Sequence, residues 1–199
     1  MRQGLQTRVT SAVKAYAAGF KGEGLDFVRN VLDGMARFRR KPFSASELSK
    51  IYARRSADQI IRDRFVAFPK VNEFEPGMHA AVGGCIDYNI VLCAVLRARG
   101  IPAKFTREGV HSRTHFFAGG KWYEADPTIA LTRHIAELRM RRGKPVNGAD
   151  LPHYISEISP ERRAELDRKK AVGTFAEGLD AWDIGILSLK DFSKYMKRD

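Results

Sequence analysis

Four residues in the middle of the chain could together carry out nucleophilic catalysis: Cys85, His111, His115 and Asp126. A cysteine thiolate can attack a carbonyl carbon, and a histidine can take up and return the proton that this reaction moves. An aspartate can hold the imidazole in the correct orientation. These residue types, with the cysteine first, are typical of thiol nucleophiles that transfer acyl groups.

Cys85 lies where a helix should begin. Residues 85–99 have the apolar spacing of a buried helix, and Gly100 is a suitable residue to end it. In the first turn of a helix, unpaired N–H groups and the macrodipole favour an anion, so a thiolate is stabilised there. Gly83 and Gly84 let a substrate approach the backbone closely, and the Cys85 N–H can help to form an oxyanion hole.

Cys93, the second of the two cysteines, lacks these features and is expected to be an inert core residue. It lies eight residues after Cys85, which corresponds to about 12 Å along a helix and is too far for a disulfide. No Cys-x-x-Cys spacing indicates a metal site, and no cofactor is expected. A reducing cytoplasm is therefore the expected compartment.

A β-hairpin should carry the histidines and the aspartate. Gly119 and Gly120 form a tight turn after the candidate strand 114–118. If the turn is centred on these two glycines, residues whose numbers add up to 239 face each other. Arg113 then lies opposite Asp126.

In the same register His115 lies opposite Glu124, and His111 and His115 project from the same face as Asp126. Either histidine could donate one ring N–H to the carboxylate and present its other nitrogen to a thiol. The competing interpretation is an ion pair between Asp126 and Arg113, with both histidines exposed.

Three motifs in a fixed order resemble the transglutaminase-like superfamily of papain-type folds. They are Gly-Cys-Ile-Asp-Tyr at 84–88, Ala-Val-Leu-Arg-Ala-Arg-Gly-Ile-Pro-Ala at 94–103 and Gly-Lys-Trp-Tyr-Glu-Ala-Asp-Pro-Thr at 120–128. The resemblance implies that Cys85 is the nucleophile, that a histidine is general base and then acid, and that Asp126 orients it. It implies no metal; animal transglutaminases use calcium, but no acidic calcium-binding loop is present here.

The choice of histidine depends on two conflicting indications. The family usually has His-x-aromatic on this strand, a pattern that His115 satisfies and His111 does not. Family hairpins are usually longer, and counting back from Trp122 favours His111. Because residues 114–118 are typical of a buried strand and residues 110–113 of a turn, His115 is the preferred triad histidine and His111 the alternative.

The expected fold class is α+β: a papain-like, transglutaminase-like core in which a central helix bearing the cysteine packs on a small antiparallel sheet. Helical parts flank this core on both sides. The chain is long enough for one domain and too short to require two. We expect a single domain over 1–199, made of a helical N-terminal part (1–66), a loop (67–84), the catalytic core (85–128) and a helical C-terminal extension (129–199).

Local signals place the flanking helices. An apolar stripe predicts a helix over 24–39, and Ser44 and Ser56 begin capping boxes. Further helices are expected over 132–142 and after Ser159 and Ser188. In the 67–84 loop, His79 could approach the reacting centre but more simply is solvated, and the Gly/Asp-rich cluster around Trp182 should anchor the C-terminal tail.

The net charge of +12 should attract acidic partners. Nucleic acid is not indicated beyond this charge, because no basic run is interleaved with the aromatic residues that stack on bases. A generally basic, soluble surface is the simpler interpretation. No apolar run is long enough for a membrane span, and Lys14 interrupts what would be the apolar core of a secretory signal.

The expected function is amide hydrolysis or acyl transfer on a peptide or protein substrate through a Cys-His-Asp triad. A thiol protease or amidase is favoured, with transglutamination next. The alternative is a catalytically silent binding module that uses its basic surface to hold an acidic protein or nucleic acid. The presence of all three triad residue types argues against that alternative.

Overall fold

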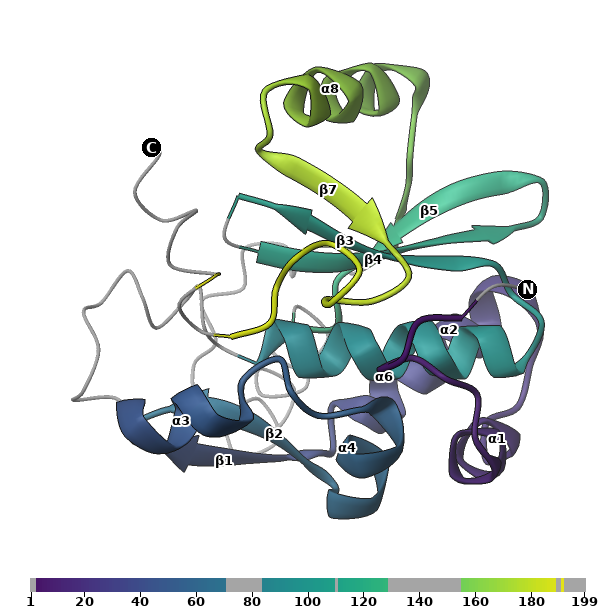
Figure 1. Cartoon of the computed structure of the whole chain (residues 1–199). Helices are drawn as coiled ribbons and strands as arrows, with labels where there is room; N and C mark the ends of the chain where they lie inside the picture. Colours follow the sequence, from purple (N-terminus) through teal and green to yellow (C-terminus); the bar gives the residue numbers. More distant parts are fainter. Residues whose placement is uncertain (1–2, 71–83, 110, 129–154, 189–190, 192–199) are drawn as a thin grey trace, which may run out of the picture.

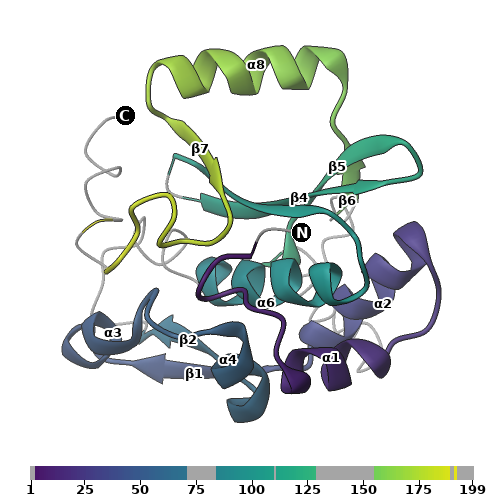
Figure 2. The same ribbon diagram turned by 45° about the vertical axis from the view of Figure 1, so that its right-hand side comes forward.

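The structure, a computed structural model, describes residues 3–70, 84–109, 111–128, 155–188 and 191. Its centre is a five-stranded antiparallel sheet with the strand order β6-β5-β4-β3-β7. Figure 1 shows helix α6 on one side of this sheet and helix α8 on the other, and the turned view in Figure 2 agrees. The strands are β3 (Ala103–Glu108), β4 (His111–Ala118), β5 (Lys121–Ala125), β6 (Ile155–Glu157) and β7 (Phe175–Gly178).

Helix α6 (Cys85–Ala98) is the core of the molecule, and each of its residues from Cys85 to Arg97 is buried. Strands β3 and β4 cover one side of it, and helices of the N-terminal part cover the other. These helices are α1 (Ser11–Ala18), α2 (Gly24–Met35) and α4 (Ala57–Asp63), whereas α3 (Ala45–Ile51) packs on the segments 39–43 and 65–69. Burial on all sides explains why most residues of α6 are apolar, and its few polar residues, Asp87, Asn89 and Arg97, are buried as well.

The predicted local signals are largely confirmed. Ser44 and Ser56 each form a complete capping box at the start of α3 and α4. Ser159 caps α8 (Pro160–Ala171) as expected. The hairpin register is also as predicted, because His115 pairs with Glu124 across the turn.

The expectation that residues 1–66 are helical and that 67–84 form a loop is wrong in one respect. Strand β1 (Arg39–Phe43) lies parallel to β2 (Phe65–Pro69), forming a second, two-stranded sheet. Arg64 adopts a left-handed conformation (φ 52°) that ends α4 and turns the chain into β2. The helix predicted over 24–39 is shorter than expected: it stops at Met35, and Arg39 already belongs to β1.

The C-terminal extension is not only helical, since it supplies β6 and β7 to the two edges of the main sheet. Its Trp182 Nε1 donates to the Ala53 carbonyl at 2.6 Å, and Asp180 Oδ2 accepts from the Gln6 N–H at 2.9 Å. The predicted anchoring role of the Trp182 cluster is thus confirmed. His79 and the helix expected over 132–142 lie outside the described residues, as does most of the one after Ser188.

None of the helices in the described part of the chain combines the length and the apolar character needed to cross a lipid bilayer.

Candidate active site

Cys85 is the first residue of α6, and its side chain is buried, with the residue 1% exposed. Gly84 precedes it in a left-handed conformation (φ 83°). A Cβ atom at position 84 would lie 2.6 Å from the ring of Phe68 in β2. Both the conformation and the close contact require glycine here, so the motif before the cysteine has a local structural cause.

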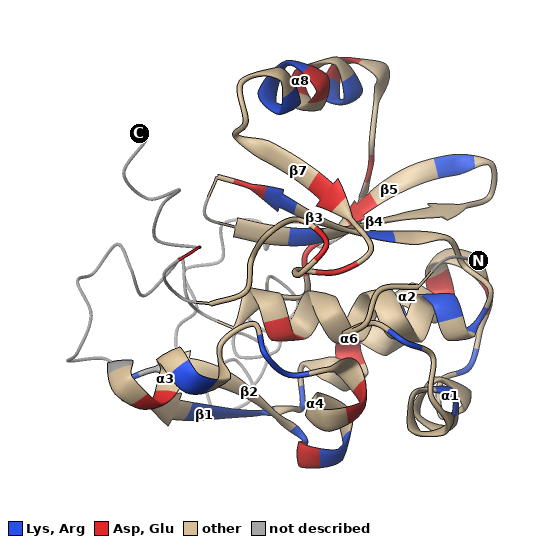
Figure 3. Ribbon diagram, viewed as in Figure 1, with Lys and Arg blue, Asp and Glu red and all other residues tan. Residues whose placement is uncertain are grey.

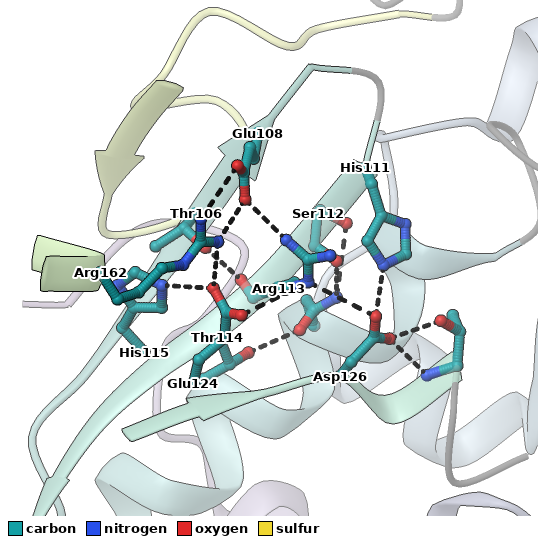
Figure 4. A network of polar contacts seen from close by, with 12 residues as sticks. Thr106, Glu108, His111, Ser112, Arg113, Thr114, His115, Glu124, Asp126 and Arg162 are labelled. Atoms are coloured by element: carbon teal, nitrogen blue, oxygen red, sulfur yellow. Dashed lines mark hydrogen bonds and ion pairs between the residues drawn. The ribbon is translucent and has the colours of Figure 1, made fainter. Parts of the chain in front are cut away.

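His111 and Asp126 meet at the end of the hairpin that is far from its turn. His111 is the first residue of β4, and Asp126 directly follows β5. The Nε2 atom of His111 lies 2.5 Å from Oδ2 of Asp126 (Figure 4). The His111 ring also forms a hydrogen bond with the Cys85 side chain. Because Nε2 faces the carboxylate, Nδ1 is the ring nitrogen left for the thiol.

The charges of this pair are set by their contacts. Burial lowers the pKa of His111, but hydrogen bonds to Asp126 and Cys85 outweigh it and raise this pKa to about 10. Burial raises the pKa of Asp126, yet the His111 hydrogen bond and charge, with Thr128, hold it below its ordinary value. At neutral pH the pair is therefore an imidazolium and a carboxylate.

Asp126 is held from two further directions. Its Oδ1 atom accepts from the Thr128 N–H at 3.0 Å, and the Arg113 Nε atom lies 3.6 Å from its Oδ2 atom. The sequence allowed either an ion pair between Arg113 and Asp126 or a contact of Asp126 with a histidine. The structure contains both, because Arg113 and His111 each contact the Asp126 carboxylate. The two arrangements share one carboxylate.

His115, the preferred histidine from the sequence, is not brought to Asp126. It is fully buried, its Nε2 atom lies 3.1 Å from Oε2 of Glu124, and its ring stacks on Phe175 with centroids 5.9 Å apart. Position 115 is four residues beyond His111, about 13 Å along a strand. Residues 110–113 were expected to form a turn, but β4 begins at His111, and this places the alternative histidine at the site.

On the sheet face that α8 covers, His115 belongs to a network of charges. Figure 4 shows Glu108 and Glu124 between the guanidinium groups of Arg113 and Arg162. Burial raises the pKa of Glu108, but hydrogen bonds from Arg162 and Lys169 outweigh it and lower this pKa to about 2. The network attaches α8 to the sheet, and among the described residues Arg113 is its link to Asp126.

Asn89 is a residue of the site that the sequence analysis missed. It lies one turn after Cys85 and is fully buried. Its Nδ2 atom donates to the carbonyl oxygens of Cys85 at 2.8 Å and Ser112 at 2.9 Å, and its Oδ1 atom accepts from the Thr114 hydroxyl at 2.7 Å. Asn89 thus connects the helix of the cysteine with the strand of His111. A polar amide within the mostly apolar run of α6 was the available signal.

Asp87 fixes the first turn of α6 from the opposite side. Its carboxylate pairs with the buried guanidinium of Arg55 and accepts from the Ala67 N–H at 2.9 Å. The start of the helix is therefore tied to β2 as well as to β4. This double attachment holds Cys85 in place relative to His111.

Cys93 is buried beside Thr114, with 3.5 Å between its Sγ atom and the hydroxyl oxygen. Burial raises the pKa of the Cys93 thiol, which suits the inert core role expected for it. Among the described residues, no group of three or more His, Cys, Asp or Glu side chains could hold a metal ion.

Comparisons with known proteins bear on the family and on the fold. Residues 37–127 match the family model of the transglutaminase-like superfamily, a range that contains Cys85, His111 and Asp126. The fold is similar to the crystal structure of a "Putative Cysteine Protease" from Cytophaga hutchinsonii, with 17% sequence identity and a TM-score of 0.51. That similarity covers 93% of this chain and 47% of the other, so this chain spans about half the length of that protein. None of the curated proteins that were compared matches the chain.

Proposed function

We propose that the chain is a cysteine-nucleophile enzyme that acts on amide bonds of peptides or proteins, because residues 37–127 match the family model of the transglutaminase-like superfamily. The observation that carries the proposal is the contact of His111 with both Cys85 and Asp126 at the start of α6. A general base or acid must lie within hydrogen-bonding reach of the group it serves, and His111 meets this requirement.

In the proposed reaction the Cys85 thiolate attacks the carbonyl carbon of an amide. The tetrahedral intermediate collapses with cleavage of the C–N bond, and the His111 imidazolium gives its proton to the departing amine. A thioester on Cys85 and a neutral imidazole remain. The imidazole then removes a proton from the incoming acceptor, whose attack releases the acyl group and restores the thiolate and the imidazolium.

The other residues of the site would support these steps. Asp126 holds the His111 ring by its Nε2 atom, so that the other ring nitrogen faces the sulfur. The N–H groups of the first turn of α6 have no helical acceptor, and they can stabilise the oxyanion that forms in the intermediate. We propose water as the main acceptor, and an amine as the acceptor in a transglutamination reaction on the same thioester.

The test is a library of peptides and primary amines incubated with the wild-type protein and with Cys85→Ala. Mass spectrometry distinguishes the possible products: cleaved peptides, deamidated side chains or cross-links to the amine. The proposal predicts a product with the wild type and none with Cys85→Ala. Cys93→Ala is the matched control, since the second cysteine is buried beside Thr114, and it should give the wild-type products.

If the wild type and Cys85→Ala leave the library equally unchanged, and Cys85 reacts no faster with a thiol probe than Cys93, the enzyme proposal fails. A binding module that keeps the fold would then be the better account.

A further inference from the structure

Three consecutive cations on β1, Arg39, Arg40 and Lys41, have exposed side chains. They line a cavity of about 410 Å³, which Pro42, Asp63 and Phe65 complete. Figure 3 shows the basic colouring of β1 at the edge of the molecule, on the two-stranded sheet. No other strand of the described chain has three adjacent cations. The proposed reaction gives these side chains no role.

Aromatic rings, and no ion pair among the described residues, orient Arg40 and Lys41. In the part of the chain that the structure describes, no carboxylate pairs with them, and Asp63 pairs instead with Arg55. The guanidinium carbon of Arg40 lies 3.9 Å from the ring centroid of Phe68, and Lys41 Nζ lies 5.2 Å from that of Phe65. Such cation–π contacts orient the charges and leave them free to attract an anion.

A short series of contacts connects this strand with the candidate nucleophile. The ring beneath Arg40 belongs to Phe68, and the same ring packs on the backbone of Gly84. Gly84 directly precedes Cys85. A substrate whose amide lies at Cys85 would therefore pass close to Arg40, the middle cation of β1.

Recognition at β1 must come from its side chains. Within the described residues, β1 pairs only with β2, so its outer edge carries no strand. Pro42 lacks an N–H group, and charged residues on an edge strand oppose pairing with a further strand. Stacking of nucleic acid bases is also disfavoured, because Arg40 already covers the ring of Phe68.

We propose that Arg39, Arg40 and Lys41 form a subsite that selects substrates with an acidic peptide segment beside the amide attacked by Cys85. The inference rests on the proposed function and adds a substrate class to it. Carboxylates of Asp and Glu side chains are the complementary groups, and Arg in particular binds carboxylates with paired hydrogen bonds.

The test measures binding of a fluorescein-labelled Asp/Glu-rich peptide to the Cys85→Ala protein by anisotropy, at low and at physiological salt. The variant Arg39→Gln/Arg40→Gln/Lys41→Gln is compared with Arg8→Gln/Lys14→Gln/Lys21→Gln, also in the Cys85→Ala background. Both lower the net charge equally, and Arg8, Lys14 and Lys21 are exposed at the N-terminal region. We expect about a tenfold loss of affinity, or about 1.4 kcal/mol, for the β1 variant and less than about a twofold loss for the control.

Equal losses in the two variants would mean that only the overall charge attracts the peptide, and the subsite proposal would be overturned. It would also be overturned if a single-stranded oligonucleotide displaced the peptide at a lower concentration than the unlabelled peptide does. Arg39→Lys/Arg40→Lys keeps both charges and should retain most of the affinity.

Alkylation of Cys85 separates this inference from the proposed function. The β1 substitutions, made in a protein that keeps Cys85, should leave the rate of alkylation by iodoacetamide unchanged. A reactive Cys85 together with peptide binding that ignores β1 would defeat the subsite alone. An inert Cys85 together with β1-dependent binding would defeat the catalytic proposal and leave the surface as a site for acidic peptides.

Discussion

Replacement of Asn89 by alanine tests whether the site depends on the connection between α6 and β4. The asparagine amide is fully buried and joins the Cys85 carbonyl, the Ser112 carbonyl and the Thr114 hydroxyl. Cys85 and His111 lie on the two elements that it connects. The substitution should therefore lower both the stability of the fold and the reactivity of the cysteine.

The size of the effect can be worked from the contacts. In Asn89→Ala the Ser112 carbonyl and the Thr114 hydroxyl lose their bonds of 2.9 and 2.7 Å inside the protein. A buried polar group left without a partner costs about 1–3 kcal/mol. Two such groups give a loss of about 2–6 kcal/mol in the free energy of unfolding. The Thr114 hydroxyl keeps a contact of 3.5 Å with Cys93 Sγ, which places the expected loss toward the lower end of this range. That is a large part of the stability of an ordinary domain.

Urea denaturation with linear extrapolation measures this loss. The matched control is Asn30→Ala in α2, where the amide is exposed and makes a single hydrogen bond of 3.1 Å to the Lys21 carbonyl. The control should cost less than about 1 kcal/mol. Alkylation of Cys85, measured where each variant is fully folded, should be slowed in Asn89→Ala and unchanged in Asn30→Ala.

Asn89→Asp gives a second, independent test. The new carboxylate has the shape of the amide but faces two carbonyl oxygens, so it should be more destabilising at neutral pH than at acid pH, where it holds a proton. If Asn89→Ala costs no more than Asn30→Ala, the connection does not hold the site together and the reasoning is refuted.

Three further changes have calculable directions. Gly84→Ala places a side chain at φ 83° and 2.6 Å from Phe68, so it should cost about 1–3 kcal/mol in urea denaturation; a neutral result would contradict the contact. Arg113→Gln removes a positive charge that lowers the pKa of Asp126, so this pKa should rise. On acidification the variant should therefore lose the stability contributed by the Asp126 carboxylate at a higher pH than the wild type does. Arg113→Lys keeps the charge and should restore the wild-type profile of stability against pH. The raised pKa of His111 contributes stability that is complete below the ordinary histidine pKa and is lost as pH rises through about 10. His111→Gln should lack this loss of stability at alkaline pH. The same alkaline unfolding curve in the wild type and in His111→Gln would contradict the prediction.

Features that depend on a few neighbouring residues could be predicted from the sequence. The left-handed Gly84 at the start of α6 and the two capping boxes act within a few residues. The hairpin register follows from one tight turn, so the sequence alone predicts that His115 pairs with Glu124.

Features that depend on contacts between distant segments could not be predicted in this way. Strand β1 has no alternating apolar pattern and is a strand because it pairs with β2, which follows two helices later. The choice between His111 and His115 was open because both face the same side of the hairpin. Only the place where α6 meets the sheet distinguishes them, and that is set by Asn89 and the packing of the whole helix.

The central claim is that His111, and not His115, activates Cys85. The most direct measurement is the rate of Cys85 alkylation by iodoacetamide against pH for the wild type, His111→Gln and His115→Gln, with peptide mapping and buried Cys93 as the internal reference. We predict that Cys85 in the wild type reacts faster than Cys93 at neutral pH, that His111→Gln removes this advantage and that His115→Gln keeps it. Loss of reactivity in His115→Gln alone, with His111→Gln like the wild type, would contradict the account.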